Sequence, residues 1–281
     1  MTGGVIAAVL TAALLHASWN ALVKAGGDRF AVLALTIGLP VFALVPLAFL
    51  VPPPAPPSWP FIAASGAIHW LYFACLLGAY RHGDLSQVYP IARGTAPLLV
   101  ALGGWLAAGE RLNALELAGI AILSVGLLSL AWRGGARRGA AETSAMLLAL
   151  ATSLAIGSYS LVDGMGARAA GSVAGYIVWA FLAIDLPFFL FALWRGRGHW
   201  RAAFGPSLKA GLVGAVISSA AYGIVIWAMS LAPMAHVVAL RETSVVMAAL
   251  IGALLLREPF GRRRVVAACV VAAGAGLLQF G

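Results

Sequence analysis

Ten runs of mostly apolar residues, each close to twenty residues long, follow one another along this chain. About twenty apolar residues are what a helix needs to cross the hydrocarbon core of a bilayer. The runs lack the alternation of apolar and polar residues that marks the strands of an outer-membrane barrel. The sequence therefore predicts an all-α polytopic membrane protein with ten transmembrane helices, at about residues 4–24, 31–51, 59–80, 86–108, 114–132, 144–163, 174–194, 207–229, 234–256 and 263–280.

The composition leaves no room for a soluble domain. Of the 281 residues, 62% are hydrophobic and 10% are charged, whereas about a quarter of a typical soluble domain is charged. No basic residue precedes the first apolar run, which favours a first membrane helix over a cleaved signal peptide. Cys75 and Cys269 both lie in apolar runs and predict neither a disulfide framework nor a metal site. We expect a single transmembrane domain over residues 1–281.

The two halves of the sequence resemble each other. When the chain is shifted by 148 positions, residues 93–110 fall on residues 241–258, and seven of the eighteen positions are identical, including Arg93 with Arg241 and Glu110 with Glu258. We therefore expect two five-helix repeats, at residues 4–132 and 144–280. Because five is odd, the second repeat must cross the membrane upside down relative to the first, an arrangement that transporters use to form a site between the halves.

The motifs at the helix ends resemble those of a known family. "GE" at 109–110 and "RE" at 257–258 close the fourth and ninth predicted helices, and "LHASWNALVK" lies in the first. With two five-helix repeats, the chain is similar to the drug/metabolite transporter superfamily, and within it to the EamA-like transporters. The resemblance implies transport, most often efflux, of amino acids, other metabolites or drugs, without a cofactor.

The basic residues are distributed unevenly between the two sides of the predicted bundle. Fourteen of the 18 lysines and arginines flank the ends of odd-numbered helices, only Arg111 and Arg168 lie on the opposite side, and Arg93 and Arg241 lie within helices. The positive-inside rule then places the odd-numbered loops in the cytoplasm and both termini outside. Related transporters are usually described with cytoplasmic termini, the opposite orientation. We expect an integral protein of a bacterial inner (plasma) membrane.

Two arginines within predicted helices are the most unusual residues of the chain. A charged side chain at the centre of a membrane helix costs roughly 3 kcal/mol or more and usually marks a functional site. Arg93 lies between Pro90 and Pro97 on a helix that we expect to be kinked. Arg241 precedes Glu242, which could neutralise it, although neighbouring residues on a helix point about 100° apart and need not pair. We expect both arginines to bind substrate, with structural pairing as the alternative.

Polar and aromatic residues at helical spacing complete the predicted cavity. His16 and Asn20 share a face of the first helix with Trp19 beside them, and either a site or a buried interhelical hydrogen bond explains them. The aromatic candidates could equally be packing residues. The full set of predicted substrate-binding residues is Arg93, Arg241, His16, Trp19, Asn20, Tyr89, His69, Tyr72, Tyr159 and Tyr222.

Five further ionisable residues receive other roles. Asp185 lies mid-span, two residues before Pro187, and is the candidate for proton coupling together with His16; a salt bridge is the alternative for Asp185. Lys24 and Asp163 lie near predicted helix ends, and Glu110 and Glu258 close their helices. We expect these four to pair at a gate, to snorkel toward the membrane surface or to fix helix ends.

A secondary transporter is the function that these observations favour. Because arginine binds carboxylates with two hydrogen bonds, we expect the exported solute to be an amino acid or another carboxylate-bearing metabolite, moved by alternating access. A drug or lipid-precursor exporter is the alternative. An intramembrane enzyme using His16, His69 and Asp185 is disfavoured, since these lie on different helices with no nucleophile or metal signature. The expected partners are the lipid bilayer and a small solute, with no nucleic acid, and the expected assembly is a monomer or homodimer.

Overall fold

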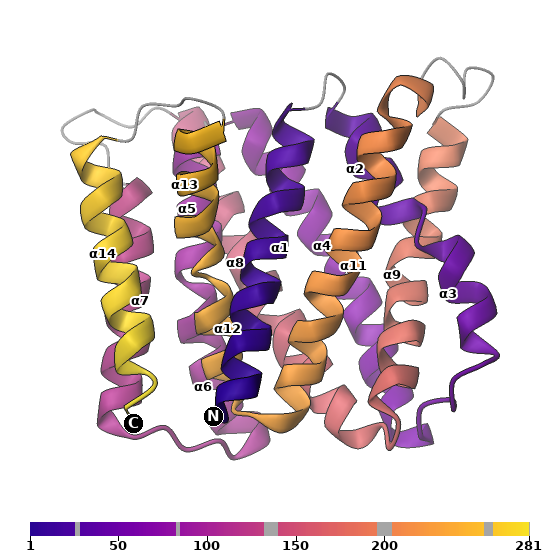
Figure 1. The fold of residues 1–281 in the computed structure, drawn as a ribbon, viewed down its shortest axis with the longest axis horizontal. Helices are drawn as coiled ribbons and strands as arrows, with labels where there is room; N and C mark the ends of the chain where they lie inside the picture. The colour runs from indigo at the N-terminus through magenta and orange to yellow at the C-terminus, as the bar shows by residue number, and fades with distance from the viewer. Residues whose placement is uncertain (26–28, 83–84, 132–139, 196–203, 256–260, 281) are drawn as a thin grey trace.

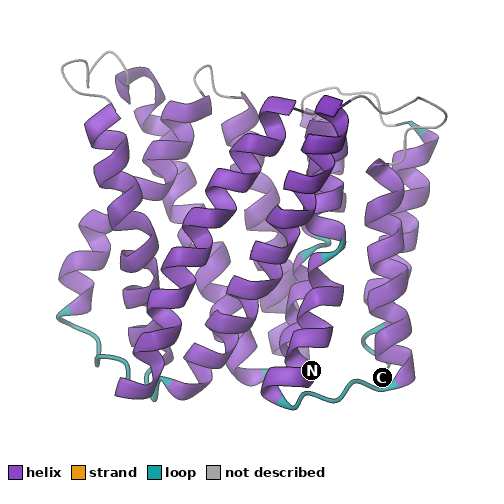
Figure 2. Ribbon diagram, turned by 180° about the vertical axis from the view of Figure 1, so that it is seen from behind, coloured by secondary structure: helices purple, strands orange, loops and turns teal. Residues whose placement is uncertain are grey.

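The computed structural model describes residues 1–25, 29–82, 85–131, 140–195, 204–255 and 261–280. Within these ranges the chain is helical and has no strand (Figure 2). Its helices stand side by side as one bundle (Figure 1). They are α1 (Gly3–Ala25), α2 (Arg29–Gly38), α3 (Val41–Ala48), η1 (Pro56–Ser58), α4 (Trp59–His82), α5 (Leu85–Gly94), α6 (Ala96–Ala108), α7 (Ala114–Ala131), α8 (Ala140–Ala169), α9 (Val173–Arg195), η2 (Gly205–Ser207), α11 (Leu208–Leu231), α12 (Met234–Arg241), α13 (Ser244–Leu255) and α14 (Arg262–Leu277).

The bundle has the surface of a membrane protein. In the described residues, nine spans are long and apolar enough to cross a membrane. The tenth predicted helix is α14, which has 16 described residues and packs along α7. Large apolar side chains point outward, among them Phe49 at 86% and Leu50 at 79% exposure. Such a surface suits lipid, and helices satisfy their backbone hydrogen bonds internally, as a bilayer requires. The predicted all-α polytopic class is confirmed.

Three of the predicted helices are interrupted. The predicted helix 31–51 is divided into α2 and α3 at Leu39–Pro40, where the proline has no N–H to donate. The predicted helix 86–108 is divided into α5 and α6 around Thr95, close to Pro97. The predicted helix 234–256 is divided into α12 and α13 at Glu242 and Thr243, which no proline foretold. The last two interruptions place Arg93 and Arg241 at helix ends.

The sixth predicted helix is longer than the sequence indicated. We predicted its end near Asp163, whereas α8 continues to Ala169. The reason is that small and apolar residues follow the aspartate, and the helix ends only where Gly171 adopts a left-handed conformation with φ of 64°. Asp163 therefore lies inside the bundle and not at its surface.

Helix α14 contacts α7 through backbone as well as side chains. A Cβ atom added at Gly274 would lie 2.6 Å from the backbone nitrogen of Leu123 and 2.7 Å from the carbonyl oxygen of Gly119. Glycines on both helices thus let the two backbones approach closely, as in other membrane helix pairs. The N- and C-termini lie at the same end of the bundle, and α1 and α13 end at the other (Figure 1).

Candidate functional site

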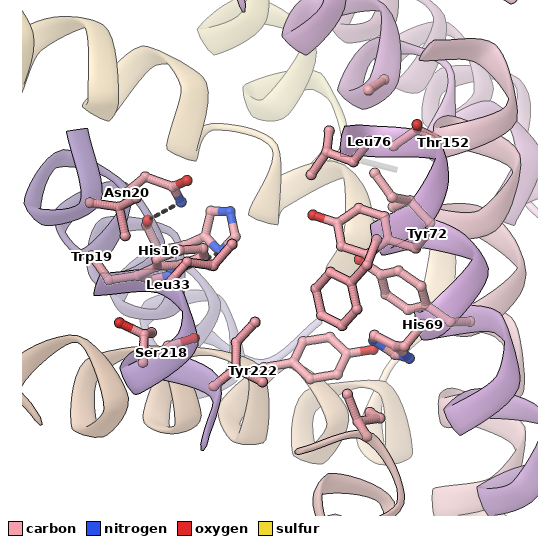
Figure 3. A pocket seen from close by; sticks show the side chains of 18 of the residues that line it. His16, Trp19, Asn20, Leu33, His69, Tyr72, Leu76, Thr152, Ser218 and Tyr222 are labelled. Atoms are coloured by element: carbon pink, nitrogen blue, oxygen red, sulfur yellow. Dashed lines mark hydrogen bonds between the residues drawn. The ribbon is translucent and has the colours of Figure 1, made fainter. Parts of the chain in front are cut away.

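A cavity of about 250 Å³ lies inside the bundle, lined by residues of α1, α2, α4, α5, α8, α9, α11 and α12. His16, Trp19 and Asn20 line one side, and Tyr72 and His69 face them from the other (Figure 3). Along α1 the lining continues to residue 23, near the helix end that lies away from the chain termini. The cavity therefore extends toward the end of the bundle opposite the termini.

The cavity brings together residues from distant parts of the sequence. All the predicted substrate-binding residues line it: His16, Trp19, Asn20, His69, Tyr72, Tyr89, Arg93, Tyr159, Tyr222 and Arg241. Asp185, the predicted proton-coupling carboxylate, lines it as well. The structure gives their position, and their role as ligands of a solute stays a prediction.

Arg93 and Arg241 are joined through one glutamate. The Nε atom of Arg93 lies 2.6 Å from Oε2 of Glu242, and Nη2 of Arg241 donates a 3.4 Å hydrogen bond to Oε1 of the same carboxylate. The three residues are nearly inaccessible, with exposed fractions of 4%, 3% and 0% for Arg93, Arg241 and Glu242. A buried charge requires such a partner, because removing one member of a buried ion pair costs roughly 3–5 kcal/mol.

The local chain explains how these charges meet. Arg93 is the penultimate residue of α5, Arg241 is the last of α12, and Glu242 lies in the turn before α13. In that turn the hydroxyl of Thr243 donates to the carbonyl oxygen of Leu240 at 2.7 Å. Because the helix is interrupted at Glu242, the carboxylate of this residue can reach both arginines. In an uninterrupted helix the side chains of Arg241 and Glu242 would point about 100° apart.

Several donors of this cluster have no acceptor. Among the described residues, Nε and Nη2 of Arg93 and Nε of Arg241 make no hydrogen bond. The short contact between Arg93 and Glu242 is therefore an ion pair without hydrogen-bond alignment. Unpaired N–H groups in a buried site are costly, and a bound anion would satisfy them. Arg93 and Arg241 line the cavity and Glu242 does not, so a solute in the cavity meets the cluster from the side of its arginines.

On the opposite side, His16 is held in one orientation. Nε1 of Trp19 donates a 3.3 Å hydrogen bond to Nδ1 of His16, and Nδ2 of Asn20 donates a 2.7 Å bond to the His16 carbonyl oxygen. Because an indole N–H only donates, Nδ1 of His16 must be the acceptor and the proton of the neutral ring must be on Nε2. Double protonation of His16 would break the bond to Trp19.

Aromatic rings form the remaining wall. His69 stacks on Tyr159, with ring centroids 4.0 Å apart, and its Nδ1 donates to the carbonyl oxygen of Ser65 at 2.9 Å. Tyr222 stacks parallel to Phe181 at 5.9 Å. Rings that contact one another in this way form a rigid apolar surface with polar edges.

Behind this wall lies a buried carboxylate that the sequence analysis placed at a helix end. Asp163 is 0% exposed and accepts hydrogen bonds from the Tyr176 hydroxyl at 3.0 Å and the Tyr222 hydroxyl at 2.6 Å. It does not snorkel, because α8 carries it well inside the bundle. Tyr222 thus lines the cavity with its ring and bonds Asp163 with its hydroxyl.

Asp185 differs from Asp163 in having no partner. Within the described part of the chain, its carboxylate makes no hydrogen bond or ion pair, and it faces the cavity from α9. The predicted alternative of a salt bridge is absent from those residues. An unpaired carboxylate in a cavity is available for a proton or for the cationic group of a solute.

A second arginine–glutamate pair lies near the end of the bundle where the termini are. Arg168 donates from Nη2 to Glu110 Oε1 at 2.7 Å and to the carbonyl oxygen of Ala232 at 2.7 Å, and from Nε to the carbonyl oxygen of Met229 at 2.9 Å. Both Glu110 oxygens accept the backbone N–H of Met234 at 3.0 Å. This network joins α8, the end of α11 and the start of α12 to the segment that follows α6, and the gate or structural role of Glu110 stays a prediction.

Two other predicted gate residues, Lys24 and Glu258, lie at or beyond the limits of the described structure. Lys24 lies at the end of α1, but its side chain is outside the described part of the structure, and Glu258 lies outside the described residues. Two participants were not predicted from the sequence: the pairing of Glu242 with Arg93, and Tyr176 as a partner of Asp163. The available signal for Glu242 was its position in the sequence. It directly follows Arg241, the repeat counterpart of Arg93.

The fold and cavity define an α-helical membrane protein with a buried polar site. The family model of the EamA-like transporter family matches residues 143–280. A solved structure described as "Crystal structure of protein" superposes with a TM-score of 0.73 and 18% sequence identity, covering 100% of this chain and 98% of that one. No curated protein matches the chain by sequence. The chain belongs to the EamA-like transporter family of the drug/metabolite transporter superfamily, as the sequence analysis predicted.

Proposed function

We propose that this transporter moves a small carboxylate-bearing solute, such as an amino acid, through the cavity between α1, α4, α8 and α11. The observation that carries the proposal is the pair of buried arginines at the cavity, which retain three guanidinium nitrogens without an acceptor in the described residues, Nε and Nη2 of Arg93 and Nε of Arg241. A carboxylate offers oxygens to such donors, and charge-assisted hydrogen bonds are about twice as strong as neutral ones.

The size and lining of the cavity support a small solute. Its volume of about 250 Å³ lies below the roughly 300–1,000 Å³ of pockets that hold drug-sized ligands. This favours a metabolite over the alternative of a drug or lipid precursor. The tyrosine rings and Trp19 favour an aromatic or planar side chain on that solute.

Asp185 supports two further proposals. In an amino acid the carboxylate binds near Arg93 and Arg241, and the ammonium group binds Asp185 on α9. Asp185 also binds and releases a proton at the cavity. His16 can accept a proton on Nδ1 when its hydrogen bond to Trp19 breaks. Export would then be coupled to protons. Counterflow that is equally fast with and without a pH gradient would leave facilitated diffusion or exchange.

Alternating access of two inverted repeats accounts for the remaining features. The family match to residues 143–280 alone, about half of the chain, supports a duplicated unit. The charge bias supports termini outside the cell, and in that orientation the cavity would extend toward the cytoplasm and the Arg168–Glu110 network would lie at the outer end. Export of a cytoplasmic solute fits this state. A C-terminal reporter that is active only in the cytoplasm tests this orientation. An active reporter would show that the C-terminus is cytoplasmic, the opposite of the proposed orientation.

Counterflow in proteoliposomes tests the solute class with four compounds that share one phenyl ring. They are phenylalanine, 3-phenylpropionate, phenethylamine and 2-phenylethanol. We expect the wild-type protein to carry the first two in preference to the last two. Arg93→Gln and Arg241→Gln should each lower transport of both carboxylates by about tenfold or more, the loss expected of one close charge pair.

Arg263→Gln provides the matched control. This residue also donates guanidinium hydrogen bonds, to the Ser129 carbonyl oxygen at 2.6 Å and 3.1 Å, but it is exposed and distant from the cavity lining. Its replacement should leave the solute preference unchanged. Equal transport of carboxylates by wild-type protein and both cavity variants would refute the proposed role of the arginines.

A further inference from the structure

We infer that Glu242 determines the charge of the anionic group that the cavity accepts. The inference rests on the proposed function, because it concerns the solute group that binds Arg93 and Arg241. The structure assigns to this cluster two guanidinium groups and one carboxylate, a net charge of one positive unit. A solute group with a single negative charge neutralises the net charge of the cluster. A group with two negative charges makes the net charge negative.

The contacts show that Glu242 serves both arginines at once. Its Oε2 lies 2.6 Å from Nε of Arg93, and its Oε1 accepts from Nη2 of Arg241. With 0% exposure, the carboxylate is shielded from the screening that water provides. Each arginine is therefore only partly neutralised, and the remaining positive charge is available to a solute.

The vacant hydrogen-bond positions indicate where that solute group binds. Nη2 of Arg93 and Nε of Arg241 have no acceptor within the described residues. One vacant donor from each arginine suits a group with two oxygens, such as a carboxylate or sulfonate. Oε2 of Glu242 forms an ion pair with Arg93 but accepts no hydrogen bond, and its negative charge would repel a second negative group on the solute.

Glu242 is the carboxylate that forms ion pairs with both arginines. Among the described residues, the ion pairs of the two arginines within 4.0 Å involve Glu242 alone. Asp185 lines the same cavity from α9 without contacting the cluster. The buried Asp163 is held by Tyr176 and Tyr222 behind the cavity wall.

The test measures two probes that share a phenyl ring and a carboxylate. 3-Phenylpropionate carries one negative charge at neutral pH, and phenylsuccinate carries two. Their half-maximal inhibition of phenylalanine or 3-phenylpropionate counterflow is measured in proteoliposomes containing the full chain. We expect the wild-type protein to prefer 3-phenylpropionate. In Glu242→Gln, with two net positive charges, the ratio should shift toward phenylsuccinate by about tenfold.

Two further variants separate charge from shape. Glu242→Asp keeps the charge and should retain the wild-type preference. The double variant Arg241→Gln with Glu242→Gln restores a net charge of one and should again favour 3-phenylpropionate. Thermal unfolding reports whether each variant is folded. If Glu242→Gln is unfolded, the Arg241→Gln variant tests the inference instead. Its cluster contains one arginine and one glutamate and has no net charge. We therefore expect it to lose the preference for 3-phenylpropionate over uncharged 3-phenylpropanamide.

The outcomes are distinguishable from failure of the proposed function. An unchanged probe ratio in Glu242→Gln, or an Arg241→Gln variant that still prefers the anion over the amide, overturns the role of Glu242 while carboxylate transport stands. If the wild-type protein accepts neither anion and the arginine variants change nothing, the proposed function fails, and this inference fails with it.

Discussion

Two arginine–glutamate clusters lie at different depths of the bundle, and they differ in how completely their hydrogen bonds are made. Arg168 has acceptors for Nε and for Nη2, namely Glu110 and two backbone carbonyl oxygens. Arg93 and Arg241 share one carboxylate and retain donors without acceptors. A guanidinium whose bonds are made stabilises the fold, whereas one with vacant donors can bind a solute.

The largest expected effect concerns solute transport at the cavity cluster. The double variant Arg93→Gln with Arg241→Gln removes both positive charges, so the carboxylate has no partner and meets Glu242 instead. We expect transport of 3-phenylpropionate to fall about a hundredfold or more, since each close charge pair contributes at least tenfold. Initial counterflow rates, normalised to folded protein, measure this. A loss no larger than that of Arg168→Gln would remove the distinction between the two clusters.

Replacement of Arg168 should instead reduce stability. Arg168→Gln removes the ion pair to Glu110 and the guanidinium hydrogen bonds to two backbone carbonyl oxygens, while the Met234 N–H still donates to Glu110. We expect a loss of about 1–3 kcal/mol in the free energy of unfolding, because hydrogen bonds to a charged group are lost while the Arg168 side chain is partly exposed to its surroundings. Thermal unfolding in detergent measures it. The probe preference of the folded fraction should stay that of the wild type, and a changed preference would show that this cluster also contacts solute.

The tyrosines bonded to Asp163 allow a finer comparison between structure and binding. Tyr176→Phe and Tyr222→Phe each remove one donor to Asp163, so both should lower stability by about 1–3 kcal/mol. Because Tyr222 also lines the cavity and Tyr176 does not contribute to the lining, we expect half-saturation for phenylalanine to change only in Tyr222→Phe. Equal effects of both variants on half-saturation would place the tyrosines in one structural role.

The smallest expected effect is at His16. Trp19→Phe removes the hydrogen bond to Nδ1 of His16 and keeps an aromatic ring in the cavity wall. One neutral hydrogen bond contributes about 1 kcal/mol, so half-saturation for 3-phenylpropionate should change by less than about tenfold. If His16 couples protons, the same variant should alter the dependence of counterflow on a pH gradient. An unaltered dependence would leave Asp185 as the coupling group.

The sequence predicted the fold because apolar run length and composition determine membrane helices almost directly. It also predicted much of the cavity lining, since Arg93, Arg241 and His16 are costly within a bilayer and helical spacing assigns them to faces. It could not predict that Glu242 bridges two helices, because that contact depends on an interruption without proline. It misplaced Asp163 because the end of α8 is set by Gly171, beyond the aspartate.

A structure of the protein with 3-phenylpropionate bound tests the central claim most directly. The account predicts the solute carboxylate within hydrogen-bond distance of Nη2 of Arg93 and Nε of Arg241, and its ring against the tyrosines of the cavity. A cavity that stays empty at saturating solute, or a solute bound elsewhere while both arginines contact only Glu242, would contradict the account.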